Sequence, residues 1–337
     1  LVNYNVNKNR VFMSKYKVSV VMSVYNDTEY LQSSIQSILS QTFDNLEFII
    51  VDDGSTDDSL QIIDKFNDNR ISLLKQNHKG LPSALNYGVS KAVGELIVRM
   101  DADDIALPDR IGKQVEFMDN NPCVSIVGGS VYLIDSDDKI IGRRIVQNKE
   151  EEIISVVSYG CPTIHPTLCF RKTFFESIGG YREVFTYAQD YDLILRAVDL
   201  KYRVTNISDI LLKYRTNKTH RLEKVYKHTK LVLLAQQLHS QRDKLLDEDK
   251  KMIALFESKM SFSLVERVIY WAYYKTLLLK LSNSFPSHLW KILNTIVCLF
   301  NKDLLTVLYN DYKYHYIMRQ NNSRKSQHDK FDTSKPI

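Results

Sequence analysis

Cysteine is scarce in this sequence, with four residues in a chain of 337. None of them forms a CxxC pair, and no histidine cluster accompanies them at the spacing of a zinc site. The sequence therefore gives no sign of a zinc domain. It predicts buried, reduced thiols in a reducing compartment.

Long hydrophobic runs are absent as well. No apolar stretch reaches the roughly 18 residues that are needed to span a bilayer, and no signal peptide opens the chain. We therefore expect a cytoplasmic protein. The polar, Asn-rich residues 1–15 predict an N-terminal arm, and the polar residues 320–337 predict a disordered tail.

Glycine-rich phosphate-binding motifs are also missing. No GxGxxG follows the first expected strand, which argues against a nicotinamide dinucleotide, and no GxxxxGK[ST] is present. A bound phosphate group would have to be held in another way, and a metal ion is the first candidate.

Charge is divided unevenly along the chain, although the net charge is only +5. Residues 1–220 carry 25 Lys and Arg against 29 Asp and Glu, whereas residues 221–337 carry 20 against 11. A basic half suggests an anionic partner, with nucleic acid and anionic membranes as the usual candidates. No nucleic-acid-binding fold accompanies this charge, so we expect no nucleic-acid partner.

The apolar pattern predicts an α/β domain over residues 16–222. Stretches of helical spacing alternate with short apolar runs, which lie at 18–23, 46–51, 71–74, 96–100 and 124–127. This alternation is typical of a mostly parallel sheet with helices on both faces. Residues 130–220 are less regular and predict a mixed continuation of the same sheet, with a hairpin formed by 131–134 and 139–145.

Residues 223–319 predict a C-terminal helical region. Its stretch 263–300 combines Trp271 and Trp290 with several Tyr and spaced Lys. Two interpretations remain open, a helix that lies in the interface of an anionic membrane and a helical cap on the core. In the first case the protein would be peripheral on the inner face of the cell membrane.

Carboxylates gather where the expected strands end, which is where open parallel sheets bind ligands. The acidic groups are Asp52 with Asp53, Asp101 with Asp103 and Asp104, and Asp190 with Asp192. Asp101 and Asp103 alternate along an extended segment, so both can face one Mg²⁺ or Mn²⁺ ion. The alternative is an Asp-rich turn that binds no metal.

Five segments of the sequence match a known family in order and spacing. They are VSVVMSVYND (18–27), FIIVDDGSTDDS (48–59), GLPSALNYGV (80–89), VRMDADDIALPDR (98–110) and GGYREVFTYAQDYDLILR (179–196). Over about residues 16–220 the chain resembles the family 2 glycosyltransferases, which have the GT-A fold. The resemblance implies an inverting, metal-dependent enzyme of the kind that builds bacterial surface polysaccharides. Its donor would be a nucleotide sugar, with UDP as the expected nucleotide, and its acceptor a glycan or a lipid-linked sugar.

The resemblance also implies roles for individual residues. Tyr25 and Asn26 would flank the nucleoside, and Asp53 together with Asp52 would bind the base or the ribose. Asp101 and Asp103 would hold the ribose and the metal on the diphosphate. Asp190 would be the catalytic base.

Four positions need separate interpretation. Where the family often has Pro, this chain has Ser23, and where it often has Glu-Asp, this chain has Gln189 before Asp190, so the role of base rests on Asp190 alone. Arg110 is expected either to contact the donor diphosphate or to pair with Asp104. His165 either faces the acceptor or has a structural role.

Other functions for the same pattern are less consistent with the sequence. A sugar-nucleotide nucleotidyltransferase, the main alternative, normally has a Gly-rich basic loop after its first strand. The corresponding segment here, SVYNDTEY, is neither Gly-rich nor basic. A phospho-acceptor signalling domain needs its paired acids after the first strand. A DxDx[TV] hydrolase needs a hydroxyl residue where Ile105 stands.

Overall fold

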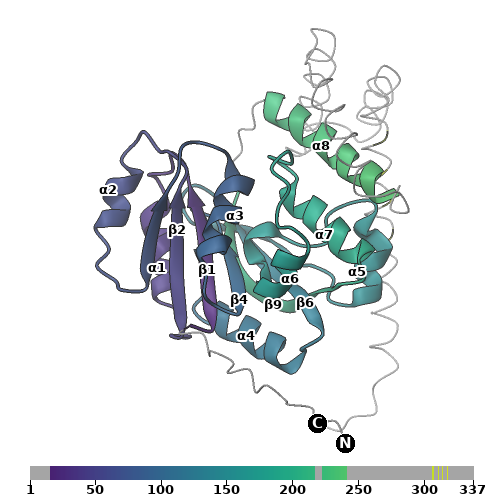
Figure 1. Cartoon of the computed structure of the whole chain (residues 1–337), viewed down its shortest axis with the longest axis horizontal. Coiled ribbons are helices and arrows are strands. Elements are labelled where there is room, and N and C mark those ends of the chain that lie inside the picture. The colour runs from purple at the N-terminus through teal and green to yellow at the C-terminus, as the bar shows by residue number, and fades with distance from the viewer. Residues whose placement is uncertain are drawn as a thin grey trace, which may run out of the picture.

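The computed structural model describes residues 16–216 and 222–240, together with positions 306, 310, 313 and 317. Within these residues nine strands form one sheet, and helices pack on its faces (Figure 1). The strands are β1 (Val18–Val24), β2 (Leu46–Asp52), β3 (Ile71–Lys75), β4 (Leu96–Met100), β5 (Ile105–Ala106), β6 (Val124–Ile134), β7 (Ile140–Arg144), β8 (Cys169–Arg171) and β9 (Arg203–Arg215). The helices are α1 (Leu31–Leu39), α2 (Ser59–Asp64), α3 (Leu81–Lys91), α4 (Arg110–Asn120), α5 (Glu150–Val157), the 3₁₀ helix η1 (His165–Thr167), α6 (Lys172–Ser177), α7 (Gln189–Asp199) and α8 (Leu222–Ser240).

The order of the strands is β3-β2-β1-β4-β8-β6-β9-β5, with β7 paired to β6. The four strands from β3 to β4 pair in parallel, as do β6 and β9. β8 runs antiparallel to both of its neighbours, and β7 and β5 also pair antiparallel. The predicted α/β class is confirmed. The long ladders are parallel, and the predicted mixed continuation contributes the short antiparallel pairs, among them β6 and β7, which are joined by a tight turn that requires opposite directions.

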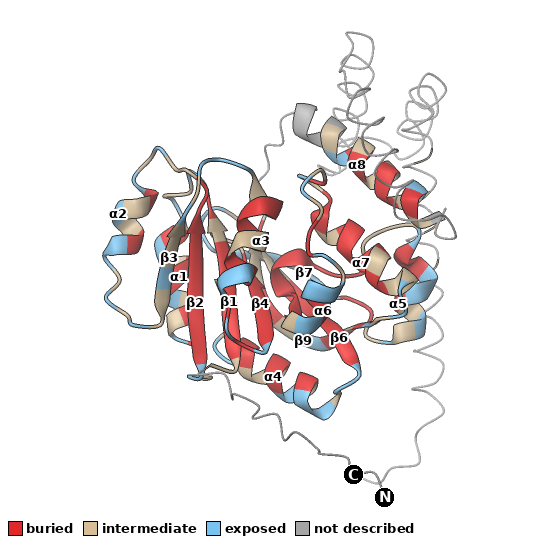
Figure 2. Cartoon of the chain, in the orientation of Figure 1, coloured by how far each residue is buried: buried red, intermediate tan, exposed pale blue. Residues whose placement is uncertain are grey.

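Helices cover both faces of the central strands because apolar residues occupy both faces. Along β1, Val20 and Met22 pack into the core with α1 and α4, whereas Val21 belongs to the core with α3, α6 and α7. The central strands are almost entirely buried between these layers (Figure 2). β4 alternates in the same way, so its position 99 faces the layer of α3, α6 and α7.

Two predicted runs, 124–127 and 131–134, are parts of one strand, β6. The small residues Gly128 and Gly129 connect them and lie close to the side chains of Asn206 and Leu211 of β9. A Cβ atom at either glycine would clash there, which explains how β9 can pair along nearly the whole length of β6.

The helix α8 lies beside α7 (Figure 1). Its residues Leu231, Leu234, Ala235 and Leu238 are buried in the same core as α7. The Gln236 side chain donates a hydrogen bond to the Tyr191 hydroxyl at 3.1 Å. The start of the predicted C-terminal region therefore packs on the α/β domain.

Most of the predicted C-terminal region, residues 223–319, lies outside the described residues, as do the N-terminal arm and the tail. Within the part of the chain that the structure describes, no helix combines the length and the apolar character that a membrane span requires.

Candidate active site

The carboxyl ends of β1, β2 and β4 meet at one edge of the sheet. The strands are parallel there, with Val24 beside Asp52 and Met22 beside Met100. The segments that follow them, 25–27, 52–55 and 101–104, are therefore neighbours in space. This edge is where open α/β sheets bind their ligands.

Asp101, Asp103 and Asp104 form a compact acidic cluster directly after β4. One ligand atom from each carboxylate lies within 4.8 Å of the others, which is close enough for the three residues to share one cation. Asp101 and Asp103 are partly exposed, and Asp104 is buried. Asp104 Oδ1 accepts a hydrogen bond from the backbone N–H of Arg215 at 2.8 Å, whereas its Oδ2 atom has no partner among the described residues.

Burial, together with repulsion between the carboxylates, raises the proton affinities in this cluster. Burial, followed by the charges of Asp101 and Asp27, raises the pKa of Asp103 to about 7. Burial and Asp101 raise the pKa of Asp104 well above its usual range. A divalent cation supplies the positive charge that the cluster needs, and carboxylate oxygens are preferred ligands of Mg²⁺ and Mn²⁺, so the residues fit such an ion.

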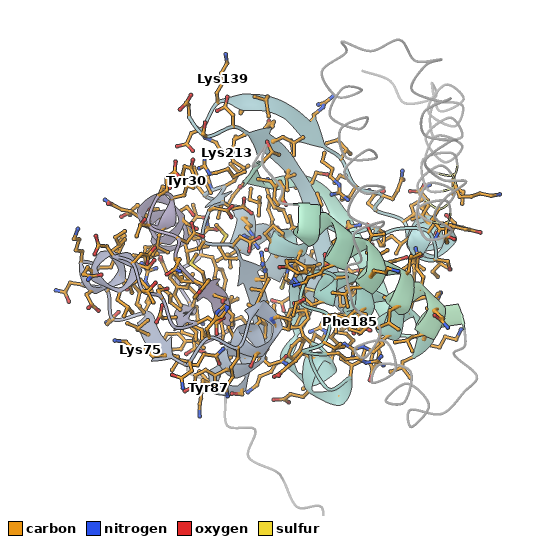
Figure 3. The ribbon with its side chains drawn as sticks, turned by 90° about the horizontal axis from the view of Figure 1, so that it is seen from above. Tyr30, Lys75, Tyr87, Lys139, Phe185 and Lys213 are labelled. Atoms are coloured by element: carbon orange, nitrogen blue, oxygen red, sulfur yellow. The ribbon has the colours of Figure 1, made fainter. Side chains whose placement is uncertain are left out.

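Arg215 holds the acidic loop in place. Its guanidinium donates to the carbonyl oxygen of Asp103 at 2.8 Å and to a carbonyl in the β6–β7 turn at 2.7 Å, and it lies 3.6 Å from the ring centroid of Tyr30. Seen from above, Tyr30, Lys213 and Lys139 lie on the same side of the molecule (Figure 3). The loop is therefore fixed between α1, β9 and the hairpin.

Tyr25 and His78 form an aromatic surface at the end of β1. Their rings stack with centroids 3.8 Å apart, and both side chains are about half exposed, at 44% for the Tyr25 residue and 54% for the His78 side chain. Asn26 has a positive φ of 50°, and its side-chain oxygen accepts the backbone N–H of Thr56 at 2.8 Å. The predicted pair Tyr25 and Asn26 thus lies at the expected edge, with Tyr25 available to a planar ligand.

Asp52 and Asp53 differ in what they contact. Asp52 Oδ1 accepts the backbone N–H of Ser55 at 3.2 Å, which orders the loop after β2. Asp53 is 1% exposed, and its carboxylate accepts hydrogen bonds from Gln76 Nε2 at 2.6 Å and from the N–H groups of Lys79 and Gly80, both at 2.9 Å.

His78 Nδ1 also lies 2.9 Å from Asp53 Oδ2. These protein groups already occupy the Asp53 carboxylate and tie it to the loop before α3. The contact of Asp53 with the base or the ribose stays a prediction, as does that of Asp52.

Asp190 lies in the first turn of α7 and is partly exposed. The Cys161 thiol contacts its Oδ2 atom at 3.9 Å. Burial raises the pKa of Asp190, while the backbone N–H of Tyr191 and the charges of His228 and Arg99 lower it. Asp190 is therefore a carboxylate with increased basicity, as a general base needs.

The structure places two predicted site residues elsewhere. Arg110 has no exposed surface, and its Nη2 atom donates to the carbonyls of Arg99 and Pro166, both at 2.6 Å. It lies in the core on the opposite face of the sheet from position 99, so neither the predicted diphosphate contact nor the predicted pair with Asp104 is formed.

His165 is also buried. Its Nε2 atom is 3.0 Å from the Tyr181 hydroxyl, and its Nδ1 atom is 3.4 Å from Gln189 Nε2. Burial and Arg99 hold its pKa well below the usual value, so the ring is neutral. The structural role is the one that the contacts support, rather than the predicted contact with the acceptor.

Three residues at the site were not predicted from the sequence. Asp27 faces the acidic cluster, and burial and the charge of Asp101 raise its pKa to about 6. Arg215 reaches the cluster from β9, far along the chain, and no sequence signal indicates this. Arg99 did carry a signal, because a charged residue inside an otherwise apolar strand needs a partner.

With this geometry established, comparisons with known proteins can be considered. The model of "Glycosyl transferase family 2" matches residues 19–179. The O-antigen biosynthesis glycosyltransferase WbnJ of Escherichia coli is 34% identical over 205 residues, which cover 59% of this chain and 79% of WbnJ. The chain belongs to glycosyl transferase family 2. The amylovoran biosynthesis glycosyltransferase AmsE of Erwinia amylovora is another relative of this glycosyltransferase, 32% identical over 58% of the chain and 75% of AmsE.

Solved structures confirm the GT-A fold of this glycosyltransferase. TarS 1-349 of S. aureus in complex with UDP-GlcNAc has a TM-score of 0.54 at 19% identity, with 91% of this chain and 92% of that chain covered. The mannosyltransferase PcManGT from Pyrobaculum calidifontis, in complex with GDP-Man and Mn²⁺, has a TM-score of 0.55 at 16% identity, with 90% and 88% covered.

Proposed function

We propose that this glycosyltransferase moves a sugar from a nucleoside diphosphate to a hydroxyl group of a glycan or lipid-linked acceptor, with inversion at the anomeric carbon. The biological setting would be the synthesis of a cell-surface polysaccharide, in keeping with the names of WbnJ and AmsE. The observation that carries the proposal is the cluster of Asp101, Asp103 and Asp104 at the carboxyl edge of the parallel strands.

The donor would bind along this edge. Asp101 and Asp103, with Asp104 behind them, would hold Mn²⁺ or Mg²⁺, which when bound neutralises charge on the departing diphosphate. The base of the nucleotide, expected to be uracil, would lie against Tyr25, with Asn26 and Asp52 beside it. The UDP-GlcNAc and GDP-Man complexes of TarS and PcManGT support a nucleotide-sugar donor.

Asp190 would act as the base. It accepts the proton of the acceptor hydroxyl as the oxygen attacks the anomeric carbon from the side opposite the diphosphate. The Cys161 thiol beside it is a poor nucleophile, because burial and Asp190 raise its pKa to about 12. With one base and, among the described residues, no activated nucleophile beside it, a single displacement with inversion is the expected course.

Two substitutions separate donor binding from transfer. Asp101→Asn is expected to weaken binding of UDP in the presence of Mn²⁺ by about tenfold, because a charged ligand of the cation is lost. Asp190→Asn is expected to leave this binding unchanged and to lower the rate of UDP release from the donor sugar by about 10²–10⁴.

The control for both variants is Asp209→Asn, which removes a carboxylate from an exposed surface pair with Lys113. Calorimetry measures the binding of UDP with Mn²⁺, and a coupled assay measures the release of UDP. A loss of nucleotide binding in Asp190→Asn equal to that in Asp101→Asn would contradict the role of Asp190 as the base.

A further inference from the structure

Arg99 is a buried cation within a strand whose other residues are apolar. It is 2% exposed, and its backbone N–H is bonded to the carbonyl of Leu168 at 2.9 Å. Because side chains alternate along β4, Arg99 lies on the face of Ile97, which packs with α7, rather than on the face of Val98 and Met100. Its guanidinium is therefore on the side of the sheet that carries Asp190.

The hydrogen bonds of Arg99 are incomplete. Its Nη2 atom is ion-paired with the carboxylate of Asp101, whereas its Nε and Nη1 atoms are buried and have no partner among the described residues. Arg110, which is equally buried, shows what a structural arginine looks like in this protein: its Nε, Nη1 and Nη2 atoms all donate to nearby side-chain or carbonyl acceptors.

A buried arginine with unmet donors destabilises the fold, so a structural role alone does not account for it. Its charge acts on both ends of the site. It lowers the proton affinity of Asp103 and Asp104 at the donor end and that of Asp190 at the acceptor end.

We infer that Arg99 is a positioning residue for Asp101. It fixes the Asp101 side chain in the orientation that the donor site needs. This inference rests on the proposed role of Asp101 in holding the cation.

The test compares Arg99→Met, which removes the charge, with Arg99→Lys, which keeps the charge and loses the planar fork. Arg203→Met is the control, since Arg203 is an exposed partner of Glu150. Each variant is checked for folding by circular dichroism. Binding of UDP is then measured by calorimetry with and without Mn²⁺, so that the part of the affinity that depends on the cation is known.

We expect Arg99→Met to bind UDP with Mn²⁺ about tenfold more weakly, because Asp101 loses its buried partner, and to bind UDP without Mn²⁺ as the wild type does. Arg99→Lys should weaken binding with Mn²⁺ similarly, because it loses the planar fork. A folded Arg99→Met with wild-type affinity for UDP with Mn²⁺ would overturn the inference. So would an equal loss of affinity with and without Mn²⁺, because the loss would then not act through Asp101 as a cation ligand.

If Arg99→Met does not fold, Arg99→Lys decides, and wild-type affinity for UDP with Mn²⁺ in that variant overturns the inference. Failure of the proposed function looks different. In that case the wild-type protein itself neither binds UDP with Mn²⁺ nor releases UDP from any donor sugar.

Discussion

The Asp103 carboxyl group makes cation binding at this site dependent on pH near neutrality. Burial, Asp101 and Asp27 raise its pKa to about 7, so in the absence of a cation it is half protonated at that pH. A cation ligand must be ionised, which means that protons and the cation compete for the same oxygen atoms. Affinity for Mn²⁺ should therefore rise with pH through 7 and fall below it.

The size of this effect follows from the ionised fraction. With a pKa of about 7, the carboxyl is about 10% ionised at pH 6 and about 90% ionised at pH 8, so the affinity for Mn²⁺ should rise by about tenfold between these values. Electron paramagnetic resonance of free Mn²⁺ measures the affinity directly, both with the protein alone and in the presence of UDP.

Asp27→Asn provides the matched variant. Asp27 raises the pKa of Asp103, and replacing its carboxylate with an amide removes that repulsion at nearly constant volume. The ratio of Mn²⁺ affinities at pH 8 and pH 6 should then be smaller than in the wild type. The titration of UDP itself is common to both proteins and cancels in the comparison. An identical ratio in both proteins, or an affinity for Mn²⁺ that does not depend on pH, would refute the reasoning.

Two further predictions concern binding of the nucleotide base at Tyr25 and binding of anionic membranes by the C-terminal residues 221–337. Tyr25→Ala should weaken UDP binding by about tenfold, because base–aromatic stacking contributes about 1–3 kcal/mol per base. The control Tyr132→Ala, on the β6–β7 hairpin, should leave UDP binding unchanged. Equal affinities of the two variants for UDP, measured by calorimetry, would show that Tyr25 does not belong to the site. The full chain should co-sediment with vesicles that contain anionic lipid, and salt should release it, because residues 221–337 carry 20 Lys and Arg against 11 Asp and Glu. Equal binding to neutral vesicles would contradict an electrostatic attraction to the membrane.

Much of the fold was predictable because it depends on local patterns. The buried strands β1, β2 and β4 are runs of apolar residues, and the helices between them show helical spacing, so their type and order could be predicted. β8, by contrast, is three residues long and antiparallel to both neighbours. Pairing of so short a segment depends on distant strands, and the local pattern does not contain that information.

Among the site residues, too, some positions could be predicted from the sequence and others could not. Asp101, Asp103, Tyr25 and Asn26 lie where the sequence placed them, because position after a parallel strand fixes a residue at the carboxyl edge. Arg110 is the last residue of the same motif, yet the first turn of α4 directs its side chain into the core. The direction of a side chain depends on helix phase and packing, which spacing along the chain does not fix.

The sequence by itself determined the family, the α/β class and the acidic residues that gather at one edge, because each of these follows from residue types and their order. Only the tertiary structure decided how those acids are used. In the folded protein the loop before α3 occupies the Asp53 carboxylate, burial neutralises His165, and Asp27 and Arg215 reach the cluster from two separate segments. The physical reason is that proton affinity and ion pairing depend on distances and burial in space, and both are set only when the strands and helices pack together.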